Sequence, residues 1–214
     1  MIWDDNWQLL GHSWAVNQIK NHLSNNQLRH AYLFTGPQGV GRRTLALRFI
    51  KAINCSQPTT PGYPCHVCRS CKLIEKVQHP DLTVLQADKV GGTLKVDQIR
   101  ELQHTLSLTP YEANYRVALI LRFEEANPNA ANALLKTLEE PESRVILMLT
   151  AQDSESLLPT IVSRCEVLRL RPHSLDNLSR GLQDQFGSNP DDAKLYAHIS
   201  EGRSGRSLRF LPSG

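Results

Sequence analysis

The fold is decided by one stretch, Gly36-Pro37-Gln38-Gly39-Val40-Gly41-Arg42-Arg43-Thr44. It follows the apolar run 31–35 and precedes residues 45–53, whose apolar spacing is typical of a helix. A strand, a glycine-rich turn and a helix in this order are the context that a phosphate-binding loop requires. The glycines let successive backbone N–H groups converge on phosphate oxygens at the start of the helix. The sequence therefore predicts a phosphate cradle at residues 36–44.

Two residues of this loop differ from those that nucleotide chemistry uses. Arg42 stands where a lysine reaches the terminal phosphates, and Arg43 stands where a serine or threonine binds Mg²⁺. Arginine pairs with phosphate, but its planar group does not match lysine in a tight cradle. Three states stay open: an empty loop, which we favour, bound ADP without hydrolysis, or a purely structural loop. The candidate nucleotide-binding residues are Gly36, Gly39, Gly41, Arg42, Arg43 and Thr44.

The acidic strand end that a phosphate-binding ATPase uses to hold Mg²⁺ and orient water is missing. The candidate strand 117–121 ends in Leu121 and continues with Arg122. Glu124 and Glu125 come two to three residues late, and we interpret them as a solvated approach to a helix rather than as shifted Mg²⁺ ligands. Positioning and charge neutralisation supply nearly all catalysis of phosphoryl transfer. We therefore expect little or no ATP hydrolysis.

The remaining pattern indicates an α/β fold, because short apolar runs alternate with helical segments. The expected strands are 31–35, 82–86, 117–121, 145–150 and 167–170, and the expected helices are 7–29, 42–54, 96–106 and 129–140. Continuous apolar runs are typical of parallel strands buried on both faces. Beyond Pro172 the pattern is helical only, at 174–186, 191–200 and 204–211. We predict a three-layer domain over 1–171 with an insertion at about 55–71, followed by a small all-helical lid domain over 172–214.

Composition restricts the partners only weakly. The 214 residues carry a net charge of +3, with 40% apolar and 21% charged residues, so bulk charge points to neither nucleic acid nor a membrane surface. No apolar run approaches the ~20 residues of a membrane span. Residues 1–5 lack the basic and apolar regions of a signal peptide. Four of the five cysteines are clustered, which favours a metal site in a reducing cytoplasm over disulfides.

The clustered cysteines are Cys55, Cys65, Cys68 and Cys71, in the pattern C-x9-C-x2-C-x2-C. Four thiolates close a tetrahedral Zn²⁺ shell, and the two-residue gaps let one turn present consecutive ligands. His66 is a spare ligand for which four cysteines leave no vacancy. A saturated shell has no open position for water, so we predict a structural zinc site. The alternative is four free buried cysteines.

Two further stretches carry a family resemblance. Residues 130–141, Ala-Ala-Asn-Ala-Leu-Leu-Lys-Thr-Leu-Glu-Glu-Pro, and 157–165, Leu-Leu-Pro-Thr-Ile-Val-Ser-Arg-Cys, resemble signatures of bacterial clamp loaders of the AAA+ superfamily. Because the loop lysine, the Mg²⁺ ligand and the strand-end acids are absent, the chain resembles the ATPase-inactive delta-prime family of DNA polymerase III rather than the motor subunits. The resemblance implies as partners the gamma/tau motor subunits and the delta subunit, with the sliding clamp and primed DNA reached through the complex.

The same resemblance assigns roles to single residues. Arg164, within Ser-Arg-Cys at 163–165, is implied as an arginine finger that enters the ATP site of a neighbouring subunit; a surface arginine or a structural ion pair is the alternative. Thr150, with Gln152 as its neighbour, falls at the first sensor position. The second sensor arginine of the motor falls at Gly205, with Arg206 next to it, so that function is expected to be lost.

One departure concerns length, since the family has a helical collar domain that joins five subunits and this chain stops soon after the lid. It is either a fragment or a short form, and we expect weak or no stable assembly.

The leading function is a non-catalytic stator of the clamp loader. A second is a divergent ATPase that uses Arg42 with Glu124 or Glu125. A third is a zinc-centred DNA-binding module. The cations that flank the cysteine cluster are Arg69, Lys72 and Lys76. No aromatic residues on which bases could stack are interleaved with them, which disfavours this function.

Overall fold

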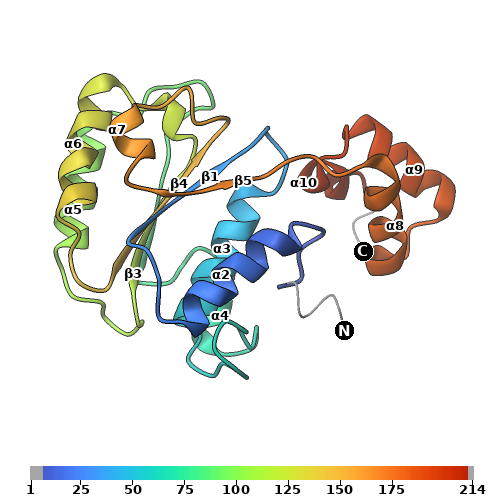
Figure 1. Cartoon of the computed structure of the whole chain (residues 1–214), viewed down its shortest axis with the longest axis horizontal. Coiled ribbons are helices and arrows are strands. Elements are labelled where there is room, and N and C mark those ends of the chain that lie inside the picture. Colours follow the sequence, from blue (N-terminus) through green and yellow to red (C-terminus); the bar gives the residue numbers. More distant parts are fainter. Residues whose placement is uncertain (1–6, 212–214) are drawn as a thin grey trace.

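The computed structural model describes residues 7–211 and contains one sheet of five parallel strands (Figure 1). The strands are β1 (Ala31–Thr35), β2 (Leu82–Leu85), β3 (Arg116–Ile120), β4 (Val145–Ala151) and β5 (Glu166–Arg169), in the spatial order β2-β3-β4-β1-β5. In the register of the sheet Leu33 lies between Leu149 and Val167. Each predicted strand is present to within one residue at each end.

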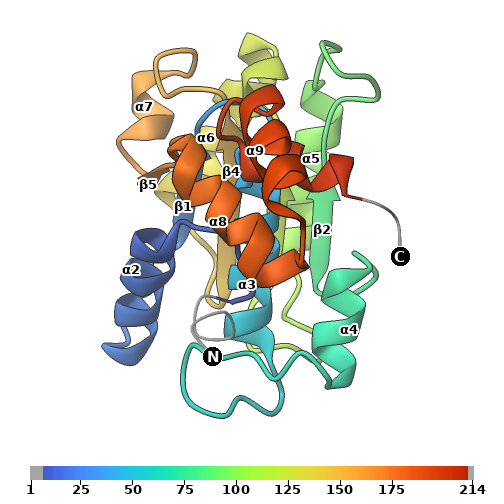
Figure 2. The ribbon, with the colours of Figure 1, turned by 90° about the vertical axis from the view of Figure 1, so that its right-hand side faces the viewer.

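Helices cover both faces of the sheet (Figures 1 and 2). One layer holds α2 (Ser13–Ser24), α3 (Arg42–Asn54) and α4 (Arg69–Glu75), and the other holds α5 (Val96–Leu106), α6 (Pro128–Glu139) and α7 (Pro159–Val162). Strand side chains pack alternately into the two layers: Phe34 and Met148 meet the first, and Leu33 and Leu147 meet the second. Because helices cover both faces, the three central strands β1, β3 and β4 are buried along their whole length and largely apolar. The predicted three-layer α/β fold is confirmed.

The chain after β5 forms a separate helical cluster, which we call the lid (Figure 1). It contains α8 (Leu175–Phe186), α9 (Pro190–Ile199), α10 (Ser204–Ser207) and the 3₁₀ helix η2 (Leu208–Phe210). Leu178, Leu182 and Ala193 form its small core, and Leu10 from the N-terminal segment packs into it. The segment before α2 is therefore shared between the lid and the sheet domain.

Two expectations about the helices need correction. The predicted helix 7–29 is shorter, because Trp7, Gln8 and His12 have positive φ angles of 54°, 56° and 58°, which a right-handed helix does not accommodate. The short helix α4 was not predicted: it begins within the insertion at about 55–71, so Cys71 lies on a helix.

Residues 1–6, on which the expectation of no signal peptide rests, lie outside the described part of the chain. Among the helices of residues 7–211, none combines the length and apolar character needed to cross a membrane.

Candidate functional site

The glycine-rich loop joins β1 to α3 with the geometry of a phosphate cradle. Gly36, Gly39 and Gly41 have φ angles of 140°, 84° and 110°, and Gly41 is the N-cap of α3. A Cβ on Gly36 would lie 2.3 Å from the carbonyl oxygen of Leu170, so only glycine fits at this position. The first turn of α3 contains no acidic residue. The loop therefore has the glycine conformations that the predicted cradle requires.

The cations of the loop differ in their surroundings. Arg42 is buried, and its Nη1 atom has no hydrogen-bond partner within residues 7–211. Burial lowers the pKa of this guanidinium, and the charge of Glu124 opposes that shift. Arg43 is exposed and lines a cavity of about 300 Å³ together with Arg122 and Arg209. The cavity is thus positively charged and has room for an anion.

The lid closes directly onto this loop. The backbone N–H of Arg206 donates to the carbonyl of Gly39 at 3.1 Å, and the Ser204 hydroxyl donates to the carbonyl of Val40 at 3.3 Å. A Cβ on Gly205 would lie 3.0 Å from the Gly39 carbonyl oxygen. Gly205, to which the resemblance assigns the second sensor position, is therefore packed against the loop backbone.

A histidine of the N-terminal segment contacts the same loop. The Nε2 atom of His12 lies 2.8 Å from the carbonyl oxygen of Val40. Burial lowers the pKa of His12, and its contact with Val40 opposes that shift. The sequence did not predict this contact, because His12 was expected inside a helix over 7–29, and that expectation does not place its ring against the loop.

The acids after β3 lie in a short helix beyond the strand end, and Oε2 of both Glu124 and Glu125 is buried without a hydrogen-bond partner among residues 7–211. Arg122 has a φ angle of 52°, which turns the chain back into the 3₁₀ helix η1 (Phe123–Glu125). Its Nε donates to Oε1 of Glu125 at 2.8 Å, and the Gly91 N–H donates to the same oxygen at 2.7 Å. The side chain of Glu125 is only 10% exposed, so its predicted solvated position is wrong: the reversal at Arg122 folds it inward as an ion-pair partner.

Thr150 on β4 and Gln152 just after it, which the resemblance assigns to the first sensor, make structural contacts. The Thr150 hydroxyl accepts a hydrogen bond from the backbone N–H of Arg122 at 3.0 Å, and Thr150 is buried. Gln152 accepts a hydrogen bond from the Gly36 N–H through its backbone carbonyl at 2.9 Å, and its side chain is exposed. Both residues therefore hold the loop region together in this structure.

Arg164 lies just after α7, in the helical layer on the other side of the sheet from α3 (Figure 1). Its Nη1 donates to the Thr160 carbonyl at 2.8 Å and its Nη2 to Oε1 of Glu139 at 2.8 Å. The side chain is 35% exposed, and that of Glu139 is 50% exposed. Arg164 thus points away from the loop of its own chain and is accessible from outside.

The four clustered cysteines come together at the junction of α3 and α4. Cys55 follows α3, Cys68 is the N-cap of α4 and Cys71 lies on α4. All four Sγ atoms lie within 4.8 Å of one another, and Cys55 lies 3.5 Å from Cys65 and 3.9 Å from Cys68. A tetrahedral zinc shell requires sulfur separations of about 3.8 Å. The four thiols could therefore hold a metal ion.

Backbone N–H groups already orient these sulfur atoms. The N–H groups of Cys65, Cys68 and Cys71 donate to the Sγ atoms of Cys55, Cys65 and Cys68 at 3.3, 3.3 and 3.4 Å. Burial raises the pKa of Cys68, but hydrogen bonds from Ser56 and Cys71 outweigh it and lower the value to about 6. Such N–H donors stabilise thiolate ligands, which is the form that binds a metal.

Comparison with known proteins identifies the family. Residues 11–174 match the model of the family described as DNA polymerase III, delta subunit. The chain belongs to this family. It is 37% identical over 186 residues to the DNA polymerase III subunit delta' of Bacillus subtilis, covering 87% of the chain and 55% of the relative. For subunit delta' of Pseudomonas aeruginosa the identity is 39% over 164 residues, covering 74% and 49%.

Tau and gamma subunits of DNA polymerase III and a branch migration motor are also similar to this delta-family chain. The tau subunit of Escherichia coli is 31% identical over 199 residues, covering 91% of the chain and 30% of tau. A gamma subunit-related protein of Thermotoga maritima superposes with a TM-score of 0.57 at 22% identity, covering 92% and 63%. The RuvB branch migration motor of the same organism gives 0.59 at 16%, covering 93% and 60%. The chain spans about half the length of its delta' relatives.

Proposed function

We propose that this chain is the AAA+ part of a delta-prime clamp-loader subunit that does not hydrolyse ATP and supplies Arg164 to the ATP site of a neighbouring motor subunit. It would act in the cytoplasm, during ATP-dependent loading of the sliding clamp on primed DNA. The gamma/tau and delta subunits would be its partners. We take 1–171 as the AAA+ domain and 172–214 as the lid domain.

The observation that carries the proposal is the lid seated on an altered loop. The loop has arginines at both chemical positions, and the adjacent strand end lines the cavity with Leu121 and Arg122 in place of acids. Hydrogen bonds from Ser204 and Arg206 occupy loop carbonyls. Hydrolysis requires Mg²⁺ and an oriented water, and the described residues of this cavity offer no carboxylate for either task.

Arg164 is suited to action in trans. Its guanidinium lies at the surface, and its only ion pair within the described residues is the half-exposed one with Glu139. An exposed pair of this kind contributes roughly 0–1 kcal/mol to stability. The guanidinium of Arg164 can therefore leave Glu139 and bind a phosphate at little cost in free energy. A planar guanidinium placed against a γ-phosphate offsets the charge that develops in phosphoryl transfer.

The proposed metal is one structural Zn²⁺ bound by Cys55, Cys65, Cys68 and Cys71. Support comes from the convergence of their Sγ atoms and from the N–H groups that donate to three of them. A zinc ion would fix the insertion against the junction of α3 and α4. The adjacent cation Arg69 is paired with Glu112, which disfavours a separate DNA-binding role for this module.

The decisive experiment substitutes Arg164→Ala and Arg164→Lys in a clamp loader assembled with its motor subunits. An arginine finger is worth roughly 10³- to 10⁵-fold in kcat at the site it serves. In Arg164→Ala, the total DNA-stimulated ATP turnover should therefore fall by the amount that this one ATP site contributes, while the complex still assembles. Arg164→Lys should not restore it, because lysine lacks the planar fork. Arg100→Ala, an exposed arginine on α5, is the matched control. Unchanged turnover at the faced site in Arg164→Ala would refute the role.

A second candidate is a subunit that binds nucleotide without turning it over. The buried and unpartnered Nη1 of Arg42 favours it, because a phosphate oxygen would satisfy that atom. Titration with a fluorescent ATP analogue, with and without Mg²⁺, alongside a turnover assay, separates the candidates. No binding supports the empty loop, and tight binding without turnover supports a resident nucleotide. Turnover would contradict both and revive the divergent ATPase.

A further inference from the structure

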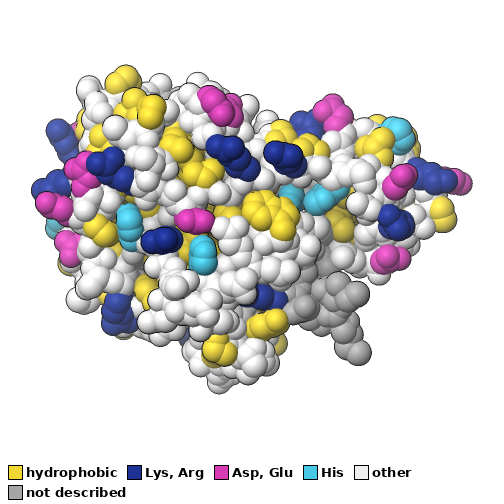
Figure 3. All heavy atoms as spheres, in the orientation of Figure 1, with side chains coloured by type: hydrophobic (Ala, Val, Ile, Leu, Met, Phe, Trp, Pro, Cys, Tyr) yellow, Lys and Arg dark blue, Asp and Glu magenta, His cyan; other side chains and the backbone are white. Residues whose placement is uncertain are grey.

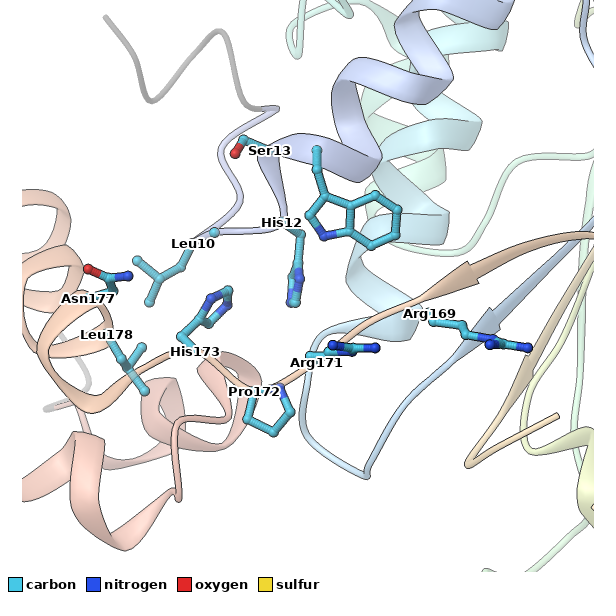
Figure 4. A pocket seen from close by; sticks show the side chains of 11 residues that line it. Leu10, His12, Ser13, Arg169, Arg171, Pro172, His173, Asn177 and Leu178 are labelled. Atoms are coloured by element: carbon cyan, nitrogen blue, oxygen red, sulfur yellow. The ribbon is translucent and has the colours of Figure 1, made fainter. Parts of the chain in front are cut away.

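A cavity of about 620 Å³ opens on the outer side of the hinge between β5 and α8 (Figure 4). It is lined by the start of α2, by the segment 169–173 and by the first turn of α8. The rings of His12 and His173 face each other there, with centroids 4.5 Å apart. No residue of the loop 36–44 belongs to its lining, and neither does Arg164. The cavity is therefore distinct from the phosphate loop, which it adjoins through His12, and from the proposed finger.

The walls of this hinge cavity are positively charged. Arg169 and Arg171 both line it, and their guanidinium groups extend in the same direction (Figure 4). Two positions apart on extended backbone, they project to the same side about 6.6 Å apart along the chain. Both are exposed, and neither guanidinium makes a hydrogen bond or ion pair with the rest of the described chain. No aspartate or glutamate of residues 7–211 lines the cavity. Such a site attracts anions.

An aromatic face and a helix start complete the site. Trp14 lines the cavity and is 47% exposed, which is unusual for so large an apolar side chain. It lies in the first turn of α2, where no side chain caps the helix and no acidic residue is present. The end of a helix with these properties carries partial positive charge. On the floor, Nε2 of His173 is buried without a hydrogen-bond partner among residues 7–211.

The surface view shows how these groups are presented to solvent. Basic, histidine and apolar side chains gather on one face of the molecule, where the sheet domain meets the lid (Figure 3). A ligand that approaches this face therefore meets cations and an apolar surface side by side.

We propose that the hinge cavity binds a nucleotide unit, with phosphate on Arg169 and Arg171 and the base stacked on Trp14. Guanidinium groups bind phosphate oxygens in pairs, and a base stacks on an exposed indole whatever its sequence. A free nucleotide and single-stranded nucleic acid share this chemistry. Two separate cations in a row fit successive phosphates of one strand, so single-stranded DNA is the expected source. This inference goes beyond the proposed function and depends neither on the Arg42 loop nor on the role of Arg164.

The test is binding of a fluorescein-labelled dT12 oligonucleotide to the whole chain, followed by anisotropy at several salt concentrations. Trp14→Ala should weaken binding roughly 5- to 100-fold, the range found for loss of one stacked base. The double variant Arg169→Ala with Arg171→Ala should lower the salt slope by about 1.4, since each phosphate contact on a single strand contributes about 0.7. Arg100→Ala with Lys194→Ala removes the same charge from exposed positions outside the cavity and should leave the slope within about 0.3.

Further arms identify the source and exclude trivial effects. If ATP displaces dT12 as well as unlabelled oligonucleotide does at the same concentration of nucleotide units, the cavity binds a nucleotide but its source is a free nucleotide. Inorganic phosphate alone should displace dT12 only weakly. Trp14→Phe keeps a stacking face and should bind better than Trp14→Ala, which separates stacking from misfolding. Arg164→Ala should bind dT12 normally, so a failure of the finger proposal leaves this one standing. Absence of dT12 and ATP binding, or equal loss in both double variants, would overturn the proposal.

Discussion

The substitution Asp81→Ala should destabilise the fold far more than the loss of an exposed carboxylate would. Asp81 is fully buried just before β2. Its carboxylate accepts backbone N–H groups of Tyr111 at 2.7 Å and of Glu112 and Ala113 at 2.9 Å. It also pairs with Nη2 of Arg116 at 3.1 Å, a side chain only 8% exposed. Burial raises the pKa of Asp81, but these hydrogen bonds and Arg116 outweigh it and lower the value.

The magnitude follows from what the substitution leaves behind. Removing one partner of a buried ion pair costs roughly 3–5 kcal/mol, because the other charge stays buried and unpaired. Three backbone donors also lose an acceptor, each worth about 1–3 kcal/mol if water cannot replace it. These terms overlap and do not add, so we expect a loss of roughly 4 kcal/mol in the free energy of unfolding. Domains of this size are stable by about 5–15 kcal/mol, so the variant should remain folded but close to the threshold.

Urea unfolding followed by circular dichroism measures this loss. Asp97→Ala is the matched control, because Asp97 is 83% exposed and pairs with Arg100 at 3.3 Å on the surface of α5, so its loss should stay within about 0.5 kcal/mol. A decrease below about 1.5 kcal/mol for Asp81→Ala, with an unchanged m value, would refute the reasoning. It would mean that solvent reaches the Arg116 site in the variant.

Three further predictions address the metal, the hinge and the loop. Freshly purified reduced protein should contain about one zinc per chain, and Cys71→Ser should lower both the zinc content by mass spectrometry and the melting temperature; a zinc content near zero would count against the site. Burial and the neighbouring His12 lower the pKa of His173 to about 4, so the unfolded chain takes up a proton near pH 6.5 and the folded chain does not. Stability should therefore fall by about 1–2 kcal/mol between pH 6.5 and 5, allowing for partial exposure, and His173→Gln should flatten this part of the pH profile of the melting temperature. The double substitution Arg42→Lys with Arg43→Thr should produce no ATP turnover in a phosphate-release assay, because the strand-end acids are still missing; measurable turnover would contradict this.

The sheet could be predicted from sequence because its signals are local. Residues 117–121 and 145–150 are continuous apolar runs, and burial on both faces is the condition under which such runs occur. The start of α3 followed from the glycine motif, and its last residue, Asn54, was also predicted. In each of these elements the local sequence pattern is strong, and no tertiary contact opposes it.

The start of α2 could not be predicted, because tertiary contacts override the helical pattern there. Trp7 is fully buried and its Nε1 donates to the Gly62 carbonyl at 2.7 Å, across 55 residues of sequence. Holding Trp7 and Leu10 in two different clusters requires left-handed backbone at Trp7 and His12. Apolar periodicity alone carries no information about such contacts.

The lid contact with the loop also lies beyond sequence patterns, since the Ser204–Val40 hydrogen bond spans 164 residues. The sequence shows only that Gly205 lacks the sensor arginine. It does not reveal that the freed space is filled by the approach of two backbones, with the Gly39 carbonyl bonded to the Arg206 N–H. A side chain at position 205 would therefore crowd the contact between lid and loop, since its Cβ would lie 3.0 Å from the Gly39 carbonyl oxygen.

This closure has a mechanical consequence that bears on the proposed function. In a nucleotide-driven subunit the bound phosphates connect loop and lid, and their loss lets the two parts move. In this chain Arg206 and Ser204 reach the loop from the lid, while His12 reaches Val40 from the segment that also anchors Leu10 in the lid core. Protein hydrogen bonds thus supply the connection that nucleotide would provide. We expect a lid held by these hydrogen bonds to keep its orientation without nucleotide, as the proposed non-hydrolysing role requires.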